Sequence, residues 1–138
     1  MPGLANSVSL SGMTTSHPLP ARRAIAGAAA AALAAAIAVV LLREGTGWWQ
    51  LIAFGAGPDL ALLLGAGRDL APGRLHPRAV PLYNALHRVW GPLLLAAAVA
   101  AGLLGTGFLV GALAWGLHIA IDRLAGYGLR TPDGFQRA

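Results

Sequence analysis

Residues 24–42 read AIAGAAAAALAAAIAVVLL, a stretch of 19 residues that contains 11 alanines and no charged side chain. At about 1.5 Å per residue, a helix of this length is close to the ~30 Å thickness of the bilayer hydrocarbon core. Because Arg22 and Arg23 precede it, the alternative is a secretory signal peptide, whose apolar region has about 7–15 residues. The greater length and the polar segment before it favour a helix that is retained in the membrane, where alanine-rich helices pack closely.

Three further apolar stretches follow, over residues 48–66, 80–104 and 108–127. Hydrophobic residues make up 57% of the chain and charged residues 11%, against about 25% charged in a typical soluble domain. A three-residue Gly-Thr-Gly segment, 105–107, separates the last two stretches, and so tight a turn makes their helices antiparallel neighbours. The sequence therefore predicts an all-α fold, an up-down bundle of four transmembrane helices.

The distribution of arginine, which accounts for all the Lys and Arg of the chain, predicts how the bundle is oriented. Two arginines precede the first span, and the successive loops and C-terminal flank hold one, three, none and two: Arg22, Arg23; Arg43; Arg68, Arg74, Arg78; Arg130, Arg137. The positive-inside rule then places the second loop and both chain ends in the cytoplasm. We expect a disordered cytoplasmic tail over 1–21, the membrane domain over 22–130 and a second tail over 131–138.

Two classes of partner or site are disfavoured by the same composition. The arginines lie in short loops rather than along one exposed basic stripe, so nucleic acid is not expected as a partner. The chain has no cysteine, which excludes disulfides, thiolate metal sites and iron–sulfur clusters.

Polar side chains lie inside the predicted spans, where a charged group costs about 2.5–3.5 kcal/mol on insertion scales. They are Asp59, Tyr83, Asn84, His87, Arg88, His118, Asp122 and Arg123. Counted at about 1.5 Å per residue from the cytoplasmic ends, the aspartates and histidines among them all lie about 8–14 Å deep. His118 and Asp122 share one helix face, and Pro58 breaks the second span directly before Asp59. The sequence thus predicts a polar cluster in the inner leaflet.

Two histidines and two aspartates at one depth are a suitable ligand set for zinc or another divalent metal: Asp59, His87, His118 and Asp122. A water molecule activated there would make the protein a membrane hydrolase with a lipid as its substrate. The chain has no spacing as specific as His-Glu-x-x-His, so the ligand types and their common depth carry this hypothesis.

Four other interpretations remain open. The network could be structural, with Asp59 and Asp122 paired to Arg88 and Arg123 and hydrogen-bonded by Tyr83 and Asn84. It could be a proton or ion pathway, or His87 and His118 could ligate a haem. The protein could also be a non-catalytic membrane subunit or assembly factor, with Gly107-x-x-x-Gly111 and the alanine-rich first helix contacting a partner or a second copy.

The ordered set of motifs in the second half of the chain resembles domain-of-unknown-function family 4260, a group of small bacterial integral membrane proteins. The set is Pro58-Asp59, Tyr83-Asn84-Ala85-Leu86-His87, Trp115, Leu117-His118-Ile119-Ala120-Ile121-Asp122-Arg123, Gly126-Tyr127-Gly128-Leu129-Arg130 and Phe135. The resemblance covers residues 48–135 and is most specific in the run that begins at His118. It implies a bacterial cytoplasmic membrane location and groups the Asp and His residues together, but supplies no reaction.

Overall fold

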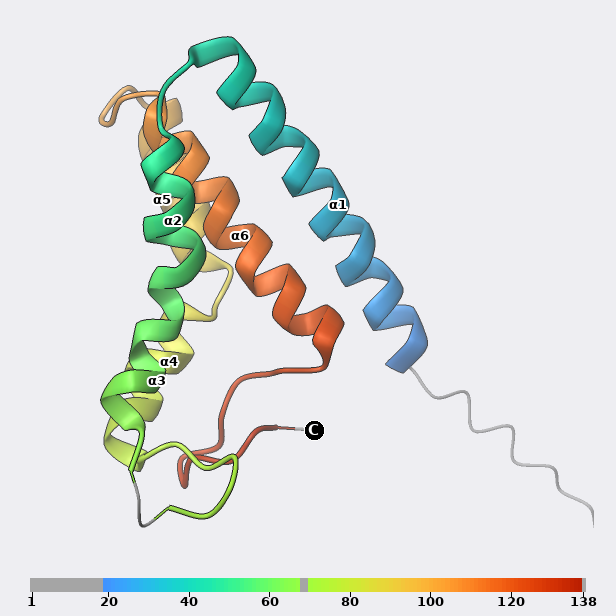
Figure 1. Ribbon diagram of the computed structural model, residues 1–138, viewed down its shortest axis with the longest axis vertical. Helices are drawn as coiled ribbons and strands as arrows, with labels where there is room; N and C mark the ends of the chain where they lie inside the picture. The colour runs from blue at the N-terminus through green and yellow to red at the C-terminus, as the bar shows by residue number, and fades with distance from the viewer. Residues whose placement is uncertain (1–18, 68–69, 138) are drawn as a thin grey trace, which may run out of the picture.

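The computed structural model describes residues 19–67 and 70–137, which form six α-helices and two short 3-10 helices (Figure 1). In chain order these are α1 (Leu19–Glu44), α2 (Trp48–Ala56), η1 (Gly57–Asp59), α3 (Leu60–Gly65), η2 (Pro77–Ala79), α4 (Val80–Leu86), α5 (Trp90–Ala100) and α6 (Gly107–Ala125). The described residues contain no β-strand, apart from an isolated bridge between Arg130 and Gln136. The all-α prediction is confirmed. The predicted disordered tail falls mostly on residues 1–18, which lie outside the described residues, and α1 begins at Leu19.

Helix α6 is the central element, and α1, α2 and α5 all pack against it. Ile37 of α1 and Val110 and Ala114 of α6 form the buried core of this contact, with Phe54 of α2 packed beside them. The α1–α2 and α5–α6 turns lie together at one end of the molecule (Figure 1), where the hydroxyl of Thr106 donates to Glu44 at 3.4 Å. The chain therefore runs up, down, up and down around α6.

Small residues on α6 allow this close packing. A Cβ atom at Gly111 would lie 2.8 Å from the Phe54 ring and 2.9 Å from the Gln50 side-chain oxygen, and Gly107 packs against the backbone of Gly47. The Gly107-x-x-x-Gly111 pair, considered from the sequence as a contact for a partner, thus receives α2 and the turn before it. The space beside these two glycines is therefore occupied by other residues of the same chain.

The two middle segments of the chain are each broken between two shorter helices. Pro58 ends α2 as expected from the sequence, and η1 joins it to α3. The segment 80–104, expected to be one helix, differs from the expectation, because α4 ends at Leu86 and α5 begins at Trp90. Pro92 explains this second break: it has no N–H to bond the carbonyl of Arg88, and its ring would clash with that carbonyl in a continuous helix.

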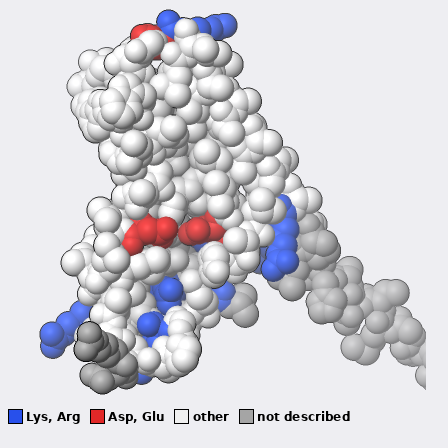
Figure 2. Space-filling model, in the orientation of Figure 1, with Lys and Arg blue, Asp and Glu red and all other residues white. Residues whose placement is uncertain are grey.

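Two helices of the described chain are long and apolar enough to cross a membrane, over Ala21–Glu44 and Gly107–Ala125. The other two expected spans are divided into shorter helices, so length and composition alone do not identify them as spans. Figure 2 shows charged side chains at two levels of one face, separated by a wide band that contains none. The sequence agrees, because residues 24–42, 45–58 and 89–121 contain no Asp, Glu, Lys or Arg.

The contact between α2 and α6 gives a test of the fold. We expect Gly111→Ala to lower the free energy of unfolding by about 1–3 kcal/mol, because the added methyl group overlaps Phe54 and Gln50. Gly55→Ala is the matched control, since its Cβ would meet nothing within 4 Å and alanine is the better helix former. Thermal unfolding in detergent measures both variants. Equal unfolding temperatures for the two would contradict this packing.

Candidate metal centre

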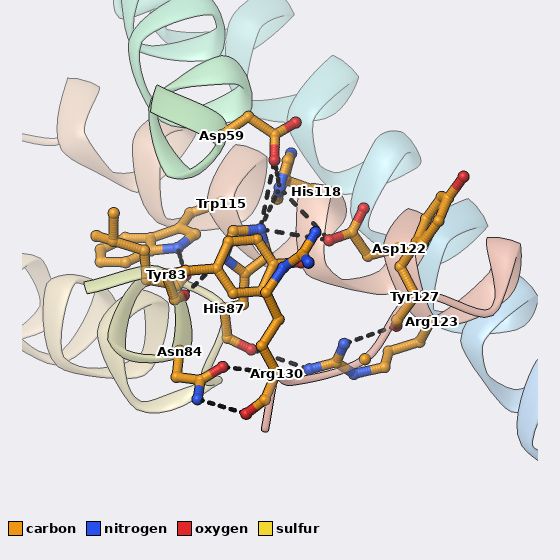
Figure 3. A network of polar contacts seen from close by, with 12 residues as sticks. Asp59, Tyr83, Asn84, His87, Trp115, His118, Asp122, Arg123, Tyr127 and Arg130 are labelled. Atoms are coloured by element: carbon orange, nitrogen blue, oxygen red, sulfur yellow. Dashed lines mark hydrogen bonds and ion pairs between the residues drawn. The ribbon is translucent and has the colours of Figure 1, made fainter. Parts of the chain in front are cut away.

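The two breaks bring their polar residues to the same place on α6. Asp59 is the last residue of η1, directly after Pro58, and His87 caps the C-terminal end of α4. His118 and Asp122 lie one turn apart on α6. In Figure 3 these four side chains point toward one another from three separate elements. The convergence expected from the depth of these residues is what the structure shows.

The donor atoms of the four side chains lie close together. The Nε2 atoms of His87 and His118 are 3.2 Å apart. Oδ1 of Asp59 lies 3.5 Å from His87 Nε2 and 3.6 Å from His118 Nε2. Oδ2 of Asp122 lies 3.4 Å and 3.8 Å from the same two nitrogens. Both carboxylates thus approach both imidazoles.

Access to the cluster is one-sided. The side chain of His87 is fully buried, those of His118 and Asp122 are 10% and 17% exposed, and that of Asp59 is 49% exposed. The exposed side of the cluster is therefore at Asp59, and its most buried residue is His87.

The orientation of His87 is fixed by its own helix. Nδ1 of His87 lies 2.8 Å from the carbonyl oxygen of Tyr83. Since a carbonyl can only accept, Nδ1 carries the proton, and in the neutral ring Nε2 presents its lone pair to the cluster. The Tyr83 ring stacks on the imidazole, with centroids 3.9 Å apart and planes at 18°. A backbone partner on the second ring nitrogen is the usual support of a metal-binding histidine.

The C-terminal segment, expected to be a tail, folds back and supports this arrangement. The guanidinium of Arg130 lies over the Tyr83 ring at 4.9 Å and donates to the carbonyls of Gly73 and Gly134, each at 2.8 Å. Asn84 donates to the Arg130 carbonyl at 2.9 Å and accepts from the Arg130 N–H at 2.7 Å. Arg130, Tyr83 and His87 therefore form one stack that begins outside the bundle and ends at the cluster.

Arg130 and Trp115 are the two supporting residues that the sequence reasoning did not assign to the cluster. Trp115 donates its indole N–H to the carbonyl of Leu86 at 2.6 Å, at the end of α4. Both residues belong to the motifs of the family resemblance, which was the available signal.

The two arginines that were expected to pair with the carboxylates do not form ion pairs with them in the part of the chain that the structure describes. Arg123 donates to the carbonyl of His87 at 3.0 Å and to that of Tyr127 at 2.8 Å, so it satisfies acceptors left free where helices end. Arg88 is exposed. Within the described residues, the ion pairs of Asp59 and Asp122 join them to the two histidines. The predicted Arg–Asp pairs are therefore not present, and the structural interpretation lacks the cations it required.

The geometry suits a metal better than a haem. Ligand bonds of about 2.0–2.2 Å in a tetrahedral site place neighbouring donor atoms about 3.3–3.6 Å apart, and the three separations among Asp59, His87 and His118 are 3.2, 3.5 and 3.6 Å. The donor atoms of Asp59, His87 and His118 all lie within 4.8 Å of one another. Two axial ligands of a haem stand on opposite faces of the macrocycle. Nitrogens 3.2 Å apart leave no room for it.

The docking of the C-terminal segment gives a test of how the site is supported. Asn84→Leu should lower the free energy of unfolding by about 1–3 kcal/mol, because it leaves the buried backbone groups of Arg130 without partners. It should also expose the segment after Gly126 to trypsin. Arg88→Gln is the control: Arg88 is exposed, so the change should stay within about 0.5 kcal/mol. Strong destabilisation by Arg88→Gln would restore the Arg–Asp interpretation.

Comparison with known proteins places the chain among relatives of unknown activity. No curated protein and no solved structure matches it. A family profile described as "Domain of unknown function (DUF4260)" matches residues 24–138, which confirms the resemblance noted in the sequence. The chain belongs to this family.

Proposed function

We propose that this protein is a four-pass protein of the bacterial cytoplasmic membrane that binds one divalent metal ion, with zinc the best fit, and uses it to hydrolyse a lipid. In this proposal Asp59, His87 and His118 are the ligands, Asp122 completes the site, and both ends of the chain are cytoplasmic. The metal and its chemistry rest on the cluster described above.

The membrane location is supported by the large apolar side chains that the bundle leaves exposed. Large apolar side chains are exposed along nearly every helix, among them Ile25, Leu42, Trp48, Leu63, Leu64, Leu94 and Leu103. A soluble monomer rarely exposes contiguous apolar patches larger than a few hundred Å². In a bilayer these side chains would contact lipid, so the free-energy cost of exposing them to water would not arise. The charge-free band between the two charged levels in Figure 2 has the character expected of the hydrocarbon region.

The second broken segment fits the membrane because the backbone carbonyls at its break have hydrogen-bond partners. Irregular backbone at membrane depth is tolerated where it is buried in protein or lines a polar cavity. The carbonyl of His87 at the second break accepts from Arg123, and that of Leu86 accepts from Trp115. We infer that 48–65 and 80–100 cross the membrane as divided helices, whose interruptions form the polar site.

Charge balance is the observation that carries the metal assignment. Two carboxylates approach two imidazoles, and the ion pairs recorded for them in the described chain involve no arginine. With neutral histidines the cluster has a formal charge of −2, which is costly in a low-dielectric setting unless a cation compensates it. A divalent ion supplies that charge and binds the donor types present.

Hydrolysis is the chemistry that this donor set favours. Catalytic zinc sites have three protein ligands and keep a position for water, whose pKa the metal lowers to about 7. Here Asp59, His87 and His118 provide three ligands, and the half-exposed Asp59 marks the open side. Asp122, next to both histidines, is placed to accept the proton of an attacking water.

Metal content and hydrolysis test the proposal together. Purified protein, dialysed against zinc and then buffer, should retain one zinc per chain by elemental analysis. His118→Ala should abolish retention with the fold preserved, because a ligand is lost. Asp122→Asn should keep the metal and lose release of labelled fatty acid from fluorescent-acyl phosphatidylglycerol, since the base is lost. His76→Ala, in the loop outside the spans, should change neither quantity.

The outcomes separate the interpretations. Loss of zinc from Asp122→Asn would make Asp122 a fourth ligand and the site a closed structural one. Wild-type protein without stoichiometric metal would overturn the metal proposal. In that case Asp122→Ala would be expected to unfold the protein, because removing one partner of a buried ionic network costs about 3–5 kcal/mol.

The cysteine-free chain allows a direct test of the membrane topology. Single cysteines introduced as Thr106→Cys and Arg137→Cys should react with a membrane-impermeant maleimide from opposite sides. In intact cells we expect labelling of Thr106→Cys alone, and labelling of Arg137→Cys after the membrane is opened. Labelling of both in intact cells would contradict four passes with a cytoplasmic C-terminus.

A further inference from the structure

An apolar groove of about 590 Å³ runs along the molecule between α1 and α5, with α6 as its floor. It exists because α1 and α5 both pack on α6 rather than mainly on each other. The floor includes three small residues of α6, whose side chains leave space above the helix: Ala112, Gly116 and Ala120. The volume is within the range of about 300–1,000 Å³ that is typical of small-molecule sites.

The lining of the groove is apolar except at one end. Arg22 of α1 and Arg123 of α6 are its charged residues, and the remaining lining side chains are aliphatic residues, glycine and proline. On α1 the groove extends from Arg22 to Leu33, which corresponds to about 17 Å of helix. One leaflet of a bilayer has a hydrocarbon depth of about 15 Å. The groove therefore has about the length of one leaflet, with both cations at the same end.

The guanidinium of Arg123 retains donors for a ligand. Its two hydrogen bonds go to the backbone carbonyls of His87 and Tyr127, whereas a guanidinium has five N–H groups. Carbonyl acceptors carry no formal charge, so the positive charge of Arg123 stays available. Guanidinium groups are well suited to binding phosphate.

We propose that this groove binds one anionic phospholipid, with an acyl chain along the α6 floor and the phosphate at Arg22 and Arg123. The inference rests on the proposed membrane location and is independent of the metal. An apolar channel of leaflet length that ends at two arginines matches a phospholipid in both its tail and its headgroup. A zwitterionic lipid of the same chains would bring an added cation to the same arginines and bind more weakly.

Native mass spectrometry of the full chain in detergent tests this, with dioleoyl phosphatidylglycerol and dioleoyl phosphatidylcholine as probes. Wild-type protein should retain one phosphatidylglycerol in preference to phosphatidylcholine. Ala29→Phe should abolish this, because Ala29 is exposed and lines the groove, so the ring occupies it. Arg22→Gln should weaken binding of phosphatidylglycerol about fivefold, the effect of one arginine near an anionic lipid.

Neighbouring residues provide matched controls. Ala28 is exposed but does not line the groove, and the same holds for Arg23. Ala28→Phe and Arg23→Gln should therefore bind phosphatidylglycerol as wild type does. Equal weakening by Arg22→Gln and Arg23→Gln, or equal retention of both lipids, would overturn the proposal. A protein dimer that lacks lipid and is dissociated by Ala29→Phe would assign the groove to a second copy instead. Zinc content, measured in parallel, should be unchanged in every variant.

Discussion

The hydrogen bond from His87 Nδ1 to the carbonyl of Tyr83 is the contact on which the site depends. It is possible because α4 ends at Leu86, so His87 leaves the helix with its imidazole turned back along the last turn. The bond fixes the ring so that Nε2 faces Asp59, His118 and Asp122, and it fixes the tautomer so that Nε2 of the neutral ring carries the lone pair. Pro92, which prevents α4 and α5 from forming one helix, is thus the residue that makes the cluster possible.

Cationic side chains around the cluster bind the backbone and an aromatic ring instead of the two carboxylates. Arg123 binds the carbonyls of His87 and Tyr127, and Arg130 binds those of Gly73 and Gly134 while covering Tyr83. These contacts satisfy backbone carbonyls that would otherwise lack hydrogen-bond partners. Within the part of the chain that the structure describes, neither guanidinium forms an ion pair with Asp59 or Asp122, whose ion pairs are with the two histidines. A purely structural network would be expected to have the opposite arrangement.

Depth and helical periodicity predicted a large part of this site, and non-local contacts account for the rest. His118 and Asp122 are related by local geometry, and the depth of Asp59 and His87 follows from counting residues, so their convergence could be expected. The break at His87 was missed, although Pro92 signalled it, because the apolar run continues through it. Arg130 was missed because its place depends on docking of residues 128–137 against the 73–76 loop. Charge counting could not show that Arg123 binds carbonyls.

Helix α6 serves two different surfaces because successive residues on a helix differ by about 100° in direction. Gly111, Ala114, His118 and Asp122 follow one line, toward α2 and the cluster, while Ala112, Gly116 and Ala120 follow a second line, along the floor of the groove. The two lines end at adjacent residues of the last turns, Asp122 at the cluster and Arg123 at the charged end of the groove. Arg123 also binds the carbonyl of His87. A headgroup held by Arg123 would therefore lie close to the backbone of His87, so Arg123 is a structural link between the groove and the cluster.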